Sequence, residues 1–145
     1  MTDSRPFSAA FHHVSISVAD LDAQQRWYQE ALGLDEVVEC FELPEPPVRT
    51  TVLRGSGGLQ VELIERAGSG RVREFDDPLD ASRDRGYGHW AIAVDDLAHA
   101  FAHLTEAGGT PVWPPAPAVR PGARFAYVKD PEGNLIELIE GPHAD

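Results

Sequence analysis

The feature that most constrains the fold of this chain is an internal duplication. Residues 13–21 read HVSISVADL, and residues 89–97 read HWAIAVDDL, 76 positions later. A second pair of segments, VELIE at 61–65 and IELIE at 136–140, lies 75 positions apart. Because the two offsets agree to within one residue, the sequence indicates two copies of one structural module.

The two copies, modules one and two, span about 9–66 and 86–141, and the polar segment 67–85 links them. Each copy opens with alternating apolar and polar residues, which is typical of a half-buried strand. Asp20 and Asp96 then stand where the N-cap of a helix is expected. The expected helices are 21–32 and 97–107, and further strands are expected near 36–42, 48–54, 59–65, 110–113, 123–129 and 134–140. Each module is therefore βαβββ, which predicts an α+β fold.

Two stretches rich in proline, 43–47 and 111–121, are expected to be loops at the rim of the sheet. The linker 67–85 is expected to connect the modules, with folding over a site as a short lid as a second possibility. All of residues 1–145 are expected to form a single domain of this duplicated kind.

Composition excludes several classes of partner. The chain has 12 basic and 24 acidic residues, a formal net charge of −12, which argues against binding to nucleic acid or to an anionic membrane. Cys40 is the only cysteine, so an internal disulfide and a cysteine-rich zinc site are excluded. No apolar run approaches the length of a bilayer, and the N-terminal MTDSRPFSAAF lacks a signal pattern. We therefore expect a cytoplasmic protein.

The duplication singles out two histidines and two glutamates, His13 and Glu62 in module one and His89 and Glu137 in module two. Both glutamates stand between apolar residues of an expected strand, where an unpaired carboxylate is costly to bury. A lone strand glutamate usually faces water and a lone histidine usually forms a rim hydrogen bond, but their joint repetition favours a metal site. Two imidazoles and two carboxylates suit one divalent ion of zinc, nickel, iron(II), cobalt or manganese.

The residues beside the two histidines are small, which leaves room for a ligand or permits close packing of the sheets. They are Ser15, Ser17, Ala91 and Ala93. Arg49 and Arg124 are equivalent under the duplication and are candidates to bind a substrate carboxylate, with a surface ion pair as the alternative. Trp113 is a candidate wall of a substrate site.

These motifs resemble the vicinal oxygen chelate superfamily, which includes glyoxalase I, methylmalonyl-CoA epimerase, extradiol dioxygenases, and fosfomycin- and bleomycin-resistance proteins. The resemblance covers about 9–141 and is closest to glyoxalase I-like members. It is carried by HHVSISVADL, WYQEALGL, GLQVELIE, GHWAIAVDDL and KDPEGNLIELIE. It implies that paired modules form a curved mixed sheet around one metal ion.

Carried over residue by residue, the resemblance assigns the four metal ligands to His13, Glu62, His89 and Glu137. It implies a lyase or isomerase of glyoxalase type, acting on a small substrate with two adjacent oxygens through a metal-stabilised enediolate. Glu137 is then the expected catalytic base, and Glu62 remains a ligand or acts on the opposite face. His12 is expected to be structural, because strand parity points it toward the helix side.

One departure concerns the substrate. Glyoxalase I has an arginine four residues after the first ligand, where it helps to hold the glutathione carboxylate, and this chain has Ser17 there. The alternatives are an iron(II) extradiol-type dioxygenase and a non-catalytic protein that binds a metabolite or antibiotic. The resemblance also implies a homodimer, with modules paired either within or between chains.

Overall fold

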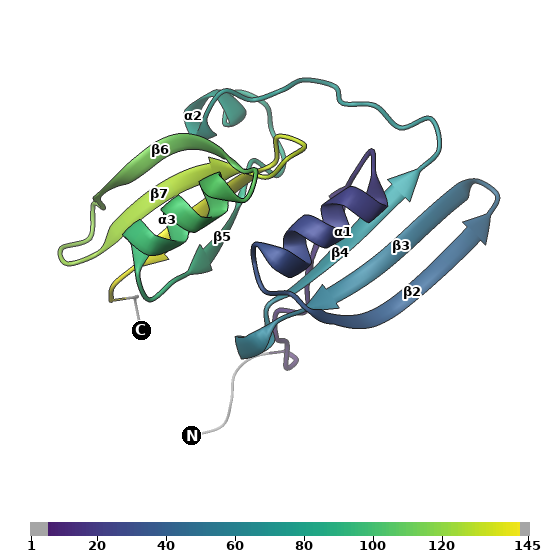
Figure 1. Cartoon of the computed structure of the whole chain (residues 1–145), viewed down its shortest axis with the longest axis horizontal. Coiled ribbons are helices and arrows are strands. Elements are labelled where there is room, and N and C mark those ends of the chain that lie inside the picture. The colour runs from purple at the N-terminus through teal and green to yellow at the C-terminus, as the bar shows by residue number, and fades with distance from the viewer. Residues whose placement is uncertain (1–5, 143–145) are drawn as a thin grey trace.

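The computed structural model describes residues 6–142 and confirms an α+β fold of two tandem βαβββ modules (Figure 1). Module one consists of β1 (Val14–Ser17), α1 (Leu21–Glu30), β2 (Glu36–Pro44), β3 (Pro47–Arg54), a short 3₁₀ turn (Ser56–Gly58) and β4 (Gln60–Arg66). The linker contains α2 (Pro78–Ala81), and module two consists of β5 (Trp90–Ala93), α3 (Leu97–Glu106), β6 (Thr110–Pro117), β7 (Arg124–Lys129) and β8 (Leu135–Glu140). The first five residues, which belong to the segment without a signal pattern, lie outside the described range. No helix within 6–142 has the length and apolar character needed to span a membrane.

Each module forms its own four-stranded mixed sheet, with strand orders β1-β4-β3-β2 and β5-β8-β7-β6. The first and last strands of a module are parallel neighbours, and the other pairs are antiparallel. In this register Ser15 lies beside Glu62, and Ala91 lies beside Glu137. The topology thus brings the start of each module next to the glutamate near its end.

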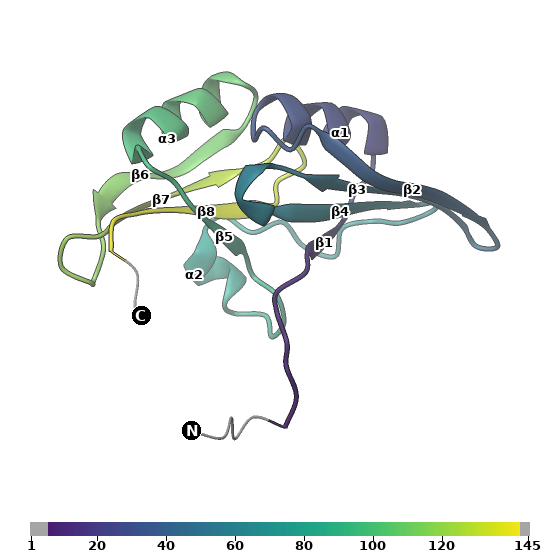
Figure 2. The ribbon, with the colours of Figure 1, turned by 90° about the horizontal axis from the view of Figure 1, so that it is seen from below.

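Helices α1 and α3 lie on the same face of the two sheets, and α2 lies on the other side (Figure 2). Asp20 and Asp96 are the N-caps that the sequence predicts, because their side chains accept hydrogen bonds from the backbone amides of Ala23 and His99. The buried apolar residues of both helices and both sheets form one core cluster. This arrangement leaves the opposite face of the sheets for the predicted site.

The prediction that residues 111–121 form a loop is wrong for its first part, because β6 runs from Thr110 to Pro117. Strand β6 is the last strand of its sheet and pairs only with β7. Proline has no amide hydrogen to donate, so it is tolerated on an edge strand where one side needs no partner. Strand β2 likewise extends to Pro44, beyond its predicted end at 42.

Side chains of the turn between β7 and β8 form hydrogen bonds with module one. The carboxylate of Asp130, 1% exposed, accepts hydrogen bonds from Gln24 and Tyr28 of α1. Two residues later, Glu132 accepts hydrogen bonds from the backbone amides of Ala19 and Asp20, at 2.7 and 3.0 Å. The start of α1 is therefore held by side chains of module two.

Candidate metal centre

In module one, His13 directly precedes β1 and lies beside Glu62 of β4, the parallel neighbour of β1. His13 Nε2 is 3.8 Å from Glu62 Oε1, and the two side chains are 33% and 19% exposed. The hydroxyl of Ser15 donates a hydrogen bond to Glu62 Oε1 at 3.0 Å. The carboxylate is thus positioned by a neighbour on β1 while both donor atoms remain accessible.

The expectation that His12 points to the helix side is not met. Strand β1 begins only at Val14, so strand parity does not fix the orientation of the residue two positions earlier. His12 Nδ1 lies 2.7 Å from Nδ1 of His13 and 3.2 Å from Nε2 of Gln60. This contact engages the far nitrogen of the His13 ring and leaves Nε2 on the side of Glu62, as is common for histidines that bind metals.

Module two repeats the pair of one histidine and one glutamate, and Tyr127 lies beside them. His89 Nε2 is 3.3 Å from Glu137 Oε2, with side chains 33% and 20% exposed. Tyr127 of β7 lies opposite Glu137, and its hydroxyl is 3.2 Å from His89 Nε2. Burial and the charge of Glu137 raise the pKa of Tyr127 above its ordinary value.

The spacing of the donor atoms in module two fits a bound divalent ion. Two protein ligands that each lie about 2.1 Å from one metal are roughly 3.0–3.4 Å apart in tetrahedral or octahedral geometry. The pair His89 and Glu137, at 3.3 Å, falls in this range, and the pair His13 and Glu62, at 3.8 Å, is slightly wider. Each module therefore offers one imidazole nitrogen and one carboxylate oxygen, donor types that zinc, nickel and iron(II) bind.

The structure brings the four predicted ligands together as two pairs, one on each sheet. Within residues 6–142, no group of three or more histidine, cysteine, aspartate or glutamate side chains lies close enough to hold a metal ion. His13 and His89 nevertheless border one cavity of about 1,340 Å³ between β1, β5 and the linker. Ser15 and Ser17 also line it, so these small residues border open space rather than a tightly packed sheet.

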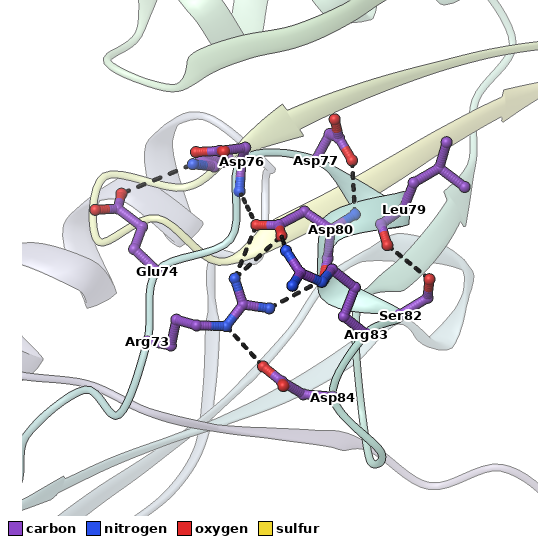
Figure 3. Close-up of polar contacts among 10 residues, drawn as sticks. Arg73, Glu74, Asp76, Asp77, Leu79, Asp80, Ser82, Arg83 and Asp84 are labelled. Atoms are coloured by element: carbon purple, nitrogen blue, oxygen red, sulfur yellow. Dashed lines mark hydrogen bonds and ion pairs between the residues drawn. The ribbon is translucent and has the colours of Figure 1, made fainter.

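The linker forms one wall of this cavity through residues 69–73 and Phe75. Figure 3 shows Arg73 between Asp80 and Asp84, to which its guanidinium donates hydrogen bonds of 2.8–3.1 Å. Arg71 donates a hydrogen bond to the backbone oxygen of Glu132. The linker thus folds against this cavity, and its expected role as a lid over the site stays a prediction.

The other glutamate of each repeated motif has a structural role that the sequence did not reveal. Glu65 accepts a hydrogen bond from the backbone amide of Leu21, and Glu140 accepts one from the amide of Leu97, both at 2.8 Å. Each carboxylate therefore satisfies a free amide in the first turn of a helix. Their repetition at the 75-residue offset was a usable signal.

Arg49 lies in an ion-paired cluster. Its guanidinium donates hydrogen bonds to Glu65 at 3.1 and 3.3 Å, and it lies 3.5 Å from Asp22. This is the ion pair that the sequence offered as the alternative to carboxylate binding. Arg124 occupies the matching register position opposite Glu140 and is exposed.

Trp113 lies on β6 in contact with Tyr127, with ring centres 5.3 Å apart. It is half-buried, and in the register of the sheet it is the neighbour of Tyr127, which in turn is the neighbour of Glu137. Of the three substrate-binding candidates, Trp113 is the one that the described contacts connect to a predicted ligand pair.

Comparison with known proteins agrees with the fold and the motifs. The family model described as the Glyoxalase/Bleomycin resistance protein/Dioxygenase superfamily matches residues 10–138. The lactoylglutathione lyase of Haemophilus influenzae is 32% identical over 129 residues, which cover 88% of this chain and 90% of that protein. The lactoylglutathione lyase of Arabidopsis thaliana is 29% identical over 133 residues, covering 91% of this chain but 44% of the plant protein. This chain therefore spans less than half the length of that relative.

Solved structures show the same fold. The glyoxalase family protein from Enterococcus faecalis superimposes with a TM-score of 0.74 at 24% identity, over 90% of this chain and 97% of that one. Glyoxalase I from Zea mays gives a TM-score of 0.67 at 28% identity, over 92% of this chain and 44% of that one. With the match over residues 10–138, these findings show that the chain belongs to the glyoxalase/bleomycin resistance/dioxygenase superfamily.

Proposed function

We propose that this protein is a metal-dependent lyase or isomerase of glyoxalase type, acting on a small substrate with two adjacent oxygens. The observation that carries this proposal is the repeated pair of one histidine nitrogen and one glutamate oxygen, at 3.8 Å in module one and 3.3 Å in module two. The names of the relatives from Haemophilus influenzae and Arabidopsis thaliana support the same class of reaction.

The ligands of the metal are His13, Glu62, His89 and Glu137. A divalent ion at these residues supplies Lewis-acid stabilisation of the negative charge that develops on the substrate oxygens. Glu137 takes the proton from the substrate carbon next to those oxygens and returns it to the neighbouring carbon. Glu62 remains in place or serves the opposite face, since it occupies the position in module one that Glu137 occupies in module two.

The complete site is formed by two chains in a homodimer, each of which contributes one pair. Two donors fill only half of a four-ligand set, and the pairs stand on two different sheets. Several large apolar side chains are exposed and available for burial against a second copy. They include Phe7, Phe11, Val72, Leu79 and Tyr87, between 69% and 105% exposed.

Ser17 lines the cavity at the position where glyoxalase I has an arginine. A hydroxyl cannot replace the charge and the forked donors of a guanidinium. We therefore place the substrate among small oxygenated compounds that do not depend on a carboxylate contact at this position.

Metal analysis of the purified protein tests the proposal directly. We expect about one equivalent of zinc, nickel or cobalt per chain, and a lower content in each of the four variants His13→Ala, Glu62→Ala, His89→Ala and Glu137→Ala. Oxygen-sensitive iron in place of these metals would indicate the dioxygenase alternative. Full metal retention in all four variants would refute the ligand assignment.

A further inference from the structure

One row of side chains crosses the sheet of module two from its edge to the metal-ligand pair. Trp113 of β6 is the register neighbour of Tyr127 of β7, which is the register neighbour of Glu137 of β8. Cross-strand neighbours share one face of a sheet. The contacts agree, since the ring centre of Tyr127 lies 5.3 Å from that of Trp113 and 5.1 Å from that of His89.

A third aromatic residue completes the surface. Phe125, two positions before Tyr127 on the same strand, has its ring centre 6.1 Å from Tyr127 and 6.2 Å from Trp113. The three rings pack edge to face, with interplanar angles of 82° or 83°. Trp113 and Phe125 are half-buried, whereas Tyr127 is 6% exposed. We refer to Trp113, Phe125 and Tyr127 as the aromatic row.

Module one shows that the sheet itself does not require these aromatic residues. The same register positions beside Glu62 hold Val52 on β3 and Glu39 on β2. The position that duplicates Phe125 is Thr50, at the same 75-residue offset. The two modules share their topology and their ligand pairs, yet one flank is aromatic and the other is aliphatic and charged. The shared architecture therefore does not account for the aromatic residues, and we attribute them to the contacts that this flank of module two makes.

We propose that the aromatic row binds an aryl or other planar apolar group of the substrate, whose two adjacent oxygens lie at the metal. This inference rests on the proposed function and narrows its substrate class. Tyr127 adjoins the ligand pair and the half-buried rings of Trp113 and Phe125 continue from it, so the row offers an apolar surface to a group attached to the chelating atoms. Ser17 supplies no positive charge for an anionic tail, and of the two arginines that line the same cavity, Arg73 is paired with Asp80 and Asp84 while Arg71 donates to the backbone oxygen of Glu132.

Two chelating probes that differ only in this group test the proposal. Acetohydroxamate and benzohydroxamate bind a metal through the same two oxygens, and only the second carries a ring. The full-length protein, loaded with zinc and checked for zinc content, is titrated with each probe by calorimetry. We expect benzohydroxamate to bind about tenfold more tightly or better, which is the size that a buried aromatic contact provides.

Variants of Trp113 test whether the aromatic row causes the preference for benzohydroxamate over acetohydroxamate. Trp113→Leu should reduce the ratio of the two dissociation constants at least about threefold and leave the zinc content unchanged, whereas Trp113→Phe should keep most of it. Phe101→Leu is the matched control, because Phe101 is an aromatic residue of module two on α3, which lies on the other face of the sheet. It should leave the ratio unaltered.

Three other outcomes separate this inference from the proposed function. If acetohydroxamate binds and the ratio is near one, the inference is wrong while the metal-centred function stands. If the ratio is near one and Trp113→Leu instead weakens association of the dimer, the row is covered by a second copy, and the inference is likewise wrong. If the protein retains none of zinc, nickel or cobalt, both fail together.

Discussion

The hydroxyl of Tyr28, in the helix of module one, donates a hydrogen bond of 2.7 Å to the carboxylate of Asp130, in the last turn of module two. Tyr28 is fully buried and Asp130 is 1% exposed, so this bond is shielded from water. Gln24 and Asn134 donate to the same carboxylate oxygen. The contact between the modules thus includes a buried charge that is satisfied from both sides.

Replacing Tyr28 with phenylalanine should lower the free energy of unfolding by about 1.5–3 kcal/mol, because one donor to a buried charged group is lost. Urea unfolding followed by tryptophan fluorescence measures this loss. Val119→Ala is the control, because Val119 is fully exposed and is not among the side chains assigned to the dimer contact, and its effect should be near zero. Equal stabilities of the two variants would show that the hydrogen bond contributes nothing net.

The same tyrosine should make the protein sensitive to alkali. Burial, followed by the charge of Asp130, raises the pKa of Tyr28 well above 10 in the folded state. Above pH of about 10 the unfolded chain loses this proton while the folded chain keeps it, so stability falls as the pH rises. The stability difference between the wild type and Tyr28→Phe should therefore narrow above pH 10 in unfolding curves measured from pH 8 to 11.

Replacing the two glutamates of each repeated motif should have different effects, one on stability and the other on metal content. Glu65→Ala and Glu140→Ala should each cost about 0.5–2 kcal/mol of stability and leave the metal content unchanged, because each removes the acceptor for a helix amide. Glu62→Ala and Glu137→Ala should lower the metal content instead. Metal analysis and urea unfolding of all four variants check this division, and a loss of metal in Glu65→Ala would contradict it.

Acid should reveal the role of Glu65 as well. Hydrogen bonds from Arg49, and then from the amide of Leu21, lower the pKa of Glu65 below 4.5. A carboxylate with a lowered pKa stabilises the fold above its ordinary pKa, and this contribution is lost as the pH falls. The stability penalty of Glu65→Ala should therefore be full at pH 7 and shrink below about pH 4.

Mixing two inactive variants should restore activity if two chains share each site. A dimer of one Glu62→Ala chain and one Glu137→Ala chain contains one site with both glutamates and one site with neither. With random pairing, about half of the dimers are mixed, so roughly one quarter of wild-type sites return. Turnover after co-refolding measures this recovery. No recovery, with mixed dimers demonstrated by mass, would place both pairs in one chain.

Glu137→Gln should keep much of its metal and lose at least about a hundredfold in turnover, the usual size of a general-base contribution. The amide oxygen still ligates, but it cannot accept the proton. Metal content and turnover of the same preparation check this, with incorporation of solvent deuterium at the reacting carbon as a second readout. Near-normal turnover with metal bound would move the role of base to Glu62.

Much of the fold could be predicted because the duplication repeated its signals. Asp20 and Asp96 marked both helix starts, and the alternation before them marked both first strands. The extent of β6 was missed because prolines usually indicate loops, and only the finished sheet shows that this strand has a free edge. Local patterns do not reveal which strand will lie at an edge.

The candidate site was predicted only as far as the two modules are alike. His13 and His89 were found as equivalents, and so were Glu62 and Glu137. Tyr127 was missed because its duplicate is Val52, so a search for repeated residues passes over it. The position of His12 was missed for another reason, since it precedes β1 and its contact with His13 depends on the path of the chain outside the strand.

The turn that holds α1 also makes the two modules impossible to interchange. At the duplicated positions, Asp130 and Glu132 correspond to Gly55 and Gly57, which carry no carboxylate. Their partners Gln24 and Tyr28 correspond, at the 76-residue offset, to Ala100 and Leu104, which cannot donate to one. A chain assembled from two copies of module one would bury Tyr28 without an acceptor, and one assembled from two copies of module two would bury Asp130 without those donors. The chain therefore needs one copy of each module, and a gene fusion that repeats either module has to supply the missing half of this contact.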